Sequence, residues 1–202
     1  MLYCVVNYWV ADYAEGEGGF NLQKTLQDAD AKTVVELFDF ELNTAQHGET
    51  TVYRFTNTKN ELGNDIVWQG NTYTAIPLKA EGYEASGQGT LPRPNISVSN
   101  LLGTFTTLIA ILPDGLEGCK VTRTRTLSKY LDAVNFTDDT NPYGTPDPTA
   151  EFPQEIYFLD RKITENRDVV QWEAVSALDL INVKLPKRIA TRDIFPGIGT
   201  FK

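Results

Sequence analysis

The segment Ile66-Val67-Trp68-Gln69-Gly70-Asn71-Thr72-Tyr73 indicates the fold most directly. Two short runs of β-forming residues flank Gly70-Asn71, and both of these turn residues tolerate the positive φ angles that a two-residue hairpin loop needs. Further along, Pro92-Arg93-Pro94 interrupts the chain before the alternating run Asn95-Ile96-Ser97-Val98-Ser99. The segment therefore predicts a β-hairpin followed by another strand, in a module with no catalytic residue on it.

Other runs of alternating or β-branched residues predict further strands, at 33–42, 50–57, 119–126, 156–163 and 169–175. In the run 33–42 the apolar positions change face between Leu37 and Phe38, which predicts a β-bulge. Apolar residues at helical spacing predict helices over 20–32 and 101–112, the second with Asn100 as its N-cap. We therefore predict a mainly β fold, an antiparallel β-barrel or sandwich with one or two short helices.

The 202 residues suffice for one large β domain or two small ones. We expect an N-terminal arm at 1–19, a β region at 20–190 and a C-terminal tail at 191–202. One alternative is that the β region consists of two subdomains with their boundary near the irregular segment 137–153. The arm has an apolar start followed by Glu15-Gly16-Glu17-Gly18-Gly19, which is typical of a flexible hinge. Such an arm either adds a strand to a neighbouring subunit or packs on its own domain.

Acidic residues outnumber basic ones by 27 to 18, so the net charge is −9. This balance argues against specific nucleic-acid binding, because contact with a phosphate backbone needs a cationic surface. It suits either simple solubility or a channel through which DNA slides without adhering. The apolar N-terminus is too short to span a bilayer, and two cysteines far apart favour a reducing cytoplasm during synthesis and assembly.

Catalytic and metal-binding patterns are weak. His47 lies in a turn that looks exposed, and as the one histidine it excludes a His-rich zinc site. In the segment 137–153, Asp139, Asn141 and Gly144 follow the spacing of a calcium loop, but Ala150 stands where the closing glutamate belongs. The sequence therefore leaves a weak ion site in this segment as an open alternative. We otherwise expect no catalytic residue, no metal and no cofactor.

Basic residues gather in the second half of the chain, where Arg123 and Arg125 share one face of a predicted strand. One explanation is that an acidic and a basic face guide ring assembly of like subunits. The other is an ordinary edge strand protected by charge. Similarly, the apolar helix predicted at 101–112 is either core or a subunit contact.

Several short motifs occur in a fixed order along the chain: Trp68-Gln69-Gly70-x-x-Tyr73, Gly82-Tyr83-x-x-x-Gly87-x-Gly89, Arg93-Pro94, Val98-Ser99-Asn100-Leu101 and Leu131-Asp132-Ala133-Val134-Asn135-Phe136. Together they resemble the minor tail protein L family of lambda-like, non-contractile-tailed phages. The resemblance is collinear from about residue 33 to residue 188. A set of motifs in register over most of the chain is more specific than any one of them.

The resemblance implies a structural virion protein of the phage tail tip, in a hub-like β ring with three-fold symmetry. Such a ring would join the distal tail tube to the central fibre or receptor-binding complex, with other tail-tip proteins as partners. Better-known members carry cysteines for an iron–sulfur cluster in a further C-terminal domain; the cluster needs thiolates that this sequence lacks after Lys184-Leu185-Pro186-Lys187-Arg188-Ile189. We therefore expect the hub part without the cluster.

The motif residues expected to have structural roles are Trp68, Gly70, Tyr73, Gly82, Gly87, Gly89, Pro94, Asn100, Asp132, Asn135 and Phe136. The residues expected at subunit interfaces are Leu2, Val5, Tyr8, Trp9, Arg93, Leu101, Phe105, Arg123 and Arg125. Two alternative functions stay open. A receptor- or carbohydrate-binding β-module would need an exposed aromatic platform from Trp9, Tyr143 or Trp172, and a polysaccharide hydrolase would need a motif that the sequence does not show.

Overall fold

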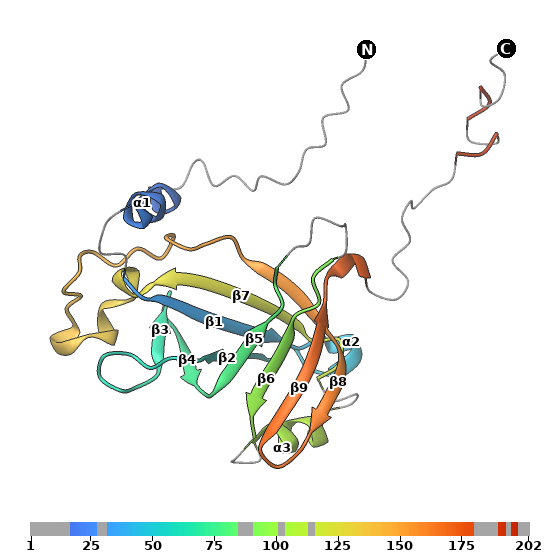
Figure 1. The fold of residues 1–202 in the computed structure, drawn as a ribbon, viewed down its shortest axis with the longest axis horizontal. Coiled ribbons are helices and arrows are strands. Elements are labelled where there is room, and N and C mark those ends of the chain that lie inside the picture. The colour runs from blue at the N-terminus through green and yellow to red at the C-terminus, as the bar shows by residue number, and fades with distance from the viewer. Residues whose placement is uncertain are drawn as a thin grey trace.

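The computed structural model of the chain describes residues 17–27, 32–84, 91–100, 104–112, 116–179, 190–192 and 195–197 (Figure 1). Within these ranges the strands are β1 (Val34–Glu41), β2 (Val52–Thr56), β3 (Ile66–Trp68), β4 (Asn71–Ala75), β5 (Leu78–Glu81), β6 (Asn95–Ser99), β7 (Lys120–Leu127), β8 (Glu155–Glu165) and β9 (Val169–Val175). The α-helices are α1 (Glu17–Leu26), the single turn α2 (Thr44–His47) and α3 (Thr104–Ile111). The mainly β fold predicted from the sequence is confirmed.

All nine of these strands belong to one sheet, in the order β3-β4-β2-β1-β7-β8-β9-β6-β5. Paired strands run antiparallel, with the exception of β2 and β4, which run parallel. The irregular segment 137–153 lies between β7 and β8, and these two strands pair directly with each other. The sheet therefore continues across the segment at which two subdomains were expected to divide.

The segment 71–81 closes this sheet into a barrel. Its first half, β4, pairs with β2, and its second half, β5, pairs with β6. Between the halves, the Ile76 N–H donates to the Thr56 carbonyl and the Pro77 carbonyl accepts from the Ser99 N–H, both at 2.9 Å. One continuous segment thus connects β2 to β6, and in Figure 1 β5 lies between them.

Both faces of β1 are buried, each against a different set of side chains. We call the first set the barrel core, because it draws on strands from all around the barrel; its members are Phe38, Phe40, Leu42, Leu78, Ile96, Val98, Leu112, Leu116, Cys119, Val121, Leu159, Val170, Trp172 and Ala174. We call the second set the outer cluster, which contains Leu22, Val35, Leu37, Ile66, Trp68, Tyr73, Leu127, Tyr130, Leu131, Phe136 and Ala150.

The two-sided burial of β1 explains why its apolar positions change face. The pairing of β1 with β2 and β7 runs through Leu37 and Phe38 without any break in register. The predicted bulge is therefore wrong. Side chains alternate regularly along the strand. Val35 and Leu37 enter the outer cluster on one face, and Phe38 and Phe40 enter the barrel core on the other.

The β3–β4 hairpin turns one residue earlier than predicted. Trp68 pairs with Asn71, so the loop is Gln69-Gly70 rather than Gly70-Asn71. Both loop residues have positive φ angles, 52° at Gln69 and 74° at Gly70, as a loop matched to the strand twist requires. Gln69 is held in this uncommon conformation, because its side-chain amide donates to the Pro148 carbonyl at 2.7 Å.

Helix α1 begins before residue 20 and ends before residue 32, the bounds predicted from the sequence. It includes Gly18 and Gly19, so the expected hinge is helical from Glu17 onward, across the predicted end of the N-terminal arm. Its side chains Leu22 and Thr25 are buried, and the Thr25 and Tyr130 hydroxyls are hydrogen-bonded at 2.5 Å. Helix α1 is therefore attached to the outer cluster, beyond the end of β7 (Figure 1).

The predicted helix at 101–112 is described over Thr104–Ile111 as α3. The Thr106 N–H donates to Asn100 Oδ1 at 3.3 Å, so Asn100 caps the first turn, and its amide also donates to the Asn166 carbonyl at 3.0 Å. This second bond ties α3 to the turn between β8 and β9. Among the helices that the structure describes, none is long and apolar enough to cross a membrane.

Candidate functional site

The one histidine has a structural position. The sequence predicted an exposed turn here, but this prediction is wrong, because His47 is only 2% exposed. Its Nδ1 accepts from the Asn43 N–H and its Nε2 donates to the Glu117 carbonyl, both at 3.0 Å. Both ring nitrogens are therefore engaged with backbone groups. Within the described ranges, no group of three or more His, Cys, Asp or Glu side chains is placed to hold a metal ion.

The motif residues come together around the β3–β4 hairpin. Asp132 and Asn135 lie in the turn that contains the 3-10 helix Ala133–Asn135, and we call this pair the hairpin clamp. Asp132 Oδ2 accepts from the Gly70 N–H at 2.9 Å. Asn135 Oδ1 accepts from the Val67 N–H at 2.8 Å, and its amide donates to the Val67 carbonyl at 2.7 Å. Two motifs that lie more than 60 positions apart thus form one unit.

The aromatic members of the same motifs fill the outer cluster beneath the hairpin. Trp68, Tyr73 and Phe136 are all buried. The Tyr73 hydroxyl donates to Asp39 Oδ2 at 3.3 Å, and burial raises the pKa of this tyrosine. Burial also raises the pKa of Asp39, although the nearby Arg54 guanidinium opposes that rise.

A second group of motif residues joins β6 to β9. Gly82, which follows β5, has a φ of 87°, a backbone conformation that other residues rarely adopt, and this explains the motif glycine. The Pro94 carbonyl accepts from the Ala174 N–H at 2.8 Å. The Arg93 guanidinium donates to Glu173 at 3.3 Å and to Asp179 at 2.5 Å.

The two arginines of β7 take part in an ion-pair network with neighbouring strands. Arg123 bonds to Glu36 of β1 and to Glu155 of β8, and Arg125 bonds to Glu155 at 3.1 Å. The Tyr83 ring lies 4.3 Å from the Arg123 guanidinium, whose side chain is only 11% exposed. Burial raises the pKa of Tyr83. This network links three adjacent strands through side chains.

Several predicted site residues lie outside the described residues: Leu2, Val5, Tyr8, Trp9, Gly87, Gly89 and Leu101. The backbone of Phe105 belongs to α3, and its side chain is not described. Arg93, Arg123 and Arg125 have the intramolecular partners given above. Their role at a subunit interface stays a prediction.

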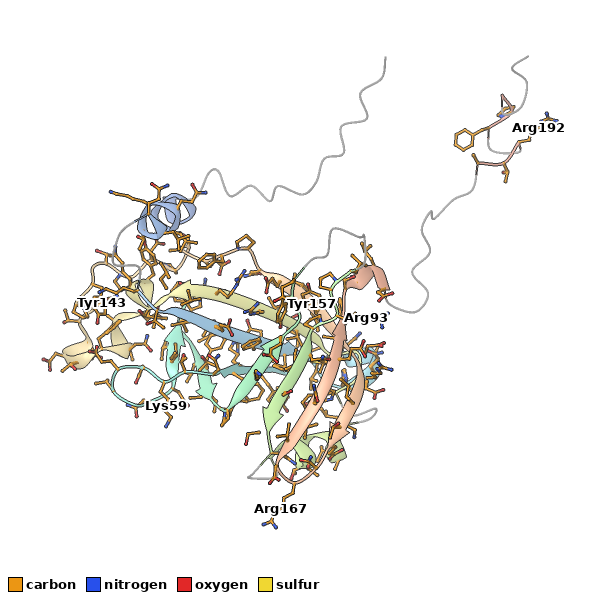
Figure 2. All side chains as sticks on the ribbon, viewed as in Figure 1. Lys59, Arg93, Tyr143, Tyr157, Arg167 and Arg192 are labelled. Carbon is orange, nitrogen blue, oxygen red and sulfur yellow. The ribbon has the colours of Figure 1, made fainter. Side chains whose placement is uncertain are left out.

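The aromatic platform that a carbohydrate-binding module would need is not formed by the described candidates. Trp172 is 1% exposed and belongs to the barrel core. Tyr143 is 39% exposed, and its ring contacts Phe136 edge-on with centroids 5.7 Å apart. Figure 2 shows Tyr143 and Lys59 at the same end of the molecule, away from Arg93 and Tyr157.

Sequence reasoning missed the acidic partners of these sites. Glu36 and Glu155 bond to arginines of β7, and Glu173 bonds to Arg161 of β8 and to Arg93, which precedes β6. Asp39 accepts a hydrogen bond from Tyr73. Strand alternation alone placed Arg123 and Arg125 on one face, but the identity of the strands beside β7 was needed to name their partners. Sheet order is a long-range property that a strand pattern does not contain.

Comparison with known proteins agrees with the motifs. The chain is 37% identical to tail tip protein L of Escherichia phage lambda over 128 residues, which are 62% of this chain and 53% of that relative. The match thus spans about half of the length of the relative. A family model described as Phage minor tail protein L matches residues 45–198, which is more than half of the chain. The chain therefore belongs to the phage minor tail protein L family.

Proposed function

We propose that this chain is a subunit of the tail tip of a non-contractile phage tail, where three copies form a ring between the distal tube and the central fibre or receptor-binding complex. Family membership makes the chain a structural phage tail protein. The proposed position at the tip is supported by the similarity to a relative that is named tail tip protein L. The three-fold ring and its neighbours follow the expectation drawn from the family resemblance.

The use of polar side chains within the described residues supports a mechanical role rather than an enzymatic one. His47 bonds to two backbone groups, and the hairpin clamp and the arginines of β7 connect elements far apart in sequence. A ring subunit that transmits force gains from such cross-links, because they hinder separation of neighbouring elements. The net charge of −9 is consistent with protein partners rather than a nucleic acid.

Location and stoichiometry need separate tests. Gold-labelled antibody against the chain should bind virions at the distal end of the tail, whereas label at the neck or along the tube would contradict the proposal. Light scattering should give three times the mass of one chain for the chain alone, or three copies of the chain in the complex that forms with purified distal tube protein. A monomer in both samples would overturn the ring.

Helix α3 offers a way to locate the ring contact. Ile111 is 72% exposed on this helix, so an aspartate there would place a charge on an apolar surface. If α3 forms the contact, Ile111→Asp should abolish the trimer. Val134→Asp is the matched control, because Val134 is also an exposed apolar side chain but belongs to the turn of the hairpin clamp. If the Ile111→Asp variant forms the trimer as completely as the Val134→Asp variant does, the exposed surface of α3 at Ile111 is not part of the contact.

A further inference from the structure

A pocket of about 280 Å³ opens beside the outer cluster. Its floor is apolar and buried, formed by Val35, Ile66, Leu131 and Phe136. Its rim is polar and includes Thr33 and Lys59, while the partly exposed ring of Tyr143 stands at its side. An apolar floor within a polar rim is the arrangement that receives a single large side chain of a protein.

Helix α1 packs on the same cluster that forms the floor of this pocket. Leu22 packs in the outer cluster with the floor residues, and Thr25 bonds to Tyr130, which lies between the lining residues Ser128 and Leu131. From Leu22 to Glu17 the helix covers about 7.5 Å. Residues 1–16 join the described chain at Glu17, five positions before Leu22.

Those preceding residues have the chemistry that the pocket fits. The first ten are mostly apolar and include Tyr3, Tyr8 and Trp9. Trp68 and Trp172, the other two tryptophans, are already buried in the outer cluster and the barrel core. Trp9 lies eight positions before Glu17, a stretch that spans up to about 26 Å when extended. An aromatic side chain also suits the rim, because Tyr143 and the ammonium of Lys32 already form an aromatic–cation pair there, 5.0 Å apart.

We propose that this pocket binds the indole of Trp9 from the same chain, which fastens residues 1–16 over the outer cluster. The inference does not depend on the ring or on the tail-tip position. It assigns the apolar N-terminal residues an intramolecular site beside α1, rather than the edge of a neighbouring subunit.

Tryptophan fluorescence of the full chain tests the proposal. Subtracting the emission of Trp9→Phe isolates Trp9, because Trp68 and Trp172 are buried and change little. We expect blue-shifted emission from Trp9 and several-fold weaker quenching by acrylamide than for an exposed indole. Both features should be the same at every protein concentration, since the contact lies within one chain.

A pocket-filling variant supplies the matched comparison. Thr33→Phe places a ring in the pocket and should make Trp9 several-fold more quenchable. Val34→Phe should not, because Val34 is exposed and does not line the pocket. If Thr33→Phe does not fold, as judged by Trp68 and Trp172 emission, Tyr143→Ala removes one wall instead and should give a smaller change in the same direction.

Three results would overturn the proposal. Trp9 quenched like a free indole in the unmodified chain would show that it is not bound. Equal protection in the Thr33→Phe and Val34→Phe variants would place Trp9 elsewhere. Protection that appears only as concentration rises would assign the pocket to the N-terminal segment of a second copy.

Discussion

The barrel core and the outer cluster share strand β1 but are enclosed in different ways. The barrel core is surrounded by strands that pair through their backbones, including the closing segment 71–81. The outer cluster is covered by α1, the β3–β4 hairpin and irregular chain between residues 128 and 152. This cover is held mainly by side chains that bond to backbone groups, as Asn135 does with Val67 and Thr126 with the Ala150 carbonyl.

The difference explains where two of the motifs lie, those at 68–73 and 131–136. A strand ladder forms from backbone groups and accepts many apolar side chains on its inner face. An irregular cover has no such ladder, so particular side chains must satisfy its peptide groups. In these two motifs, Trp68, Tyr73 and Phe136 belong to the outer cluster, Asp132 and Asn135 form the hairpin clamp, and the clamp binds the Gly70 N–H.

Truncating one buried tryptophan on each side should break the comparison most clearly. Trp172→Ala leaves a cavity in the barrel core and should lower the free energy of unfolding by about 3–5 kcal/mol. Trp68→Ala should cost less, because the hairpin and its cover can loosen without opening the barrel. Urea unfolding followed by circular dichroism measures both costs.

Hydrogen exchange shows which parts open in these two variants. Trp172→Ala should increase exchange in β6 and β9, whereas Trp68→Ala should increase it in β3, β4 and the segment 130–150. Equal loss of protection at β6 and β9 in both variants would show that the two clusters unfold as one unit.

Removing the side chain of the hairpin clamp should have a smaller effect. Asn135→Ala leaves the N–H and carbonyl of Val67 without their partner and should cost about 2–3 kcal/mol. Thermal unfolding of the variant measures the loss. Asn141→Ala is the control, because its amide also donates to backbone carbonyls, those of Lys129 and Leu131, but from a less buried position. If Asn141→Ala lowers the thermal stability as much as Asn135→Ala does, the hairpin clamp contributes no more than an ordinary hydrogen bond from a side-chain amide to the backbone.

The smallest expected effect is a pH dependence of the outer cover. Burial raises the pKa of Glu151 above its usual 4.5, and the nearby Asp39 carboxylate adds to the rise. The folded state therefore binds this proton more tightly than the unfolded chain does. The resulting stabilisation is fully present below pH 4.5 and is lost as pH increases through the raised pKa.

The variant Glu151→Gln lacks this titration. Its free energy of unfolding should exceed that of the unmodified chain at pH 7, and the difference should shrink as the pH falls toward 4.5. Denaturant unfolding at several pH values measures the trend, with Glu61→Gln as a control of equal charge change at an exposed position. A difference that is constant with pH would contradict the assignment.

Most strands were predictable from the sequence because each carries a local pattern. The strands at 33–42 and 169–175 match β1 and β9 within about two residues, since alternation and flanking turns are properties of the segment itself. The hairpin loop was misplaced by one residue, because the Gln69 side chain bonds to the distant Pro148. Local propensity favoured Gly70-Asn71, and a tertiary contact overruled it.

The candidate site was predictable only as a set of residues. Their order along the chain indicated the family, but it did not show that Asn135 binds Val67 or that Asp132 binds Gly70. The parallel pairing of β2 with β4 and the burial of His47 were also hidden, because both depend on how segments meet in space. Burial on both faces of β1 produced an apolar pattern that resembles a bulge.

The bond between Asn135 and Val67 also bears on how copies of this protein avoid one another. Strand β3 is the last strand at its end of the sheet, and its outward N–H and carbonyl at Val67 would attract an extended segment of another chain. The Asn135 amide occupies both groups as a paired strand would. Loss of this one side chain should therefore make the protein prone to edge-to-edge aggregation, even where the monomer still folds.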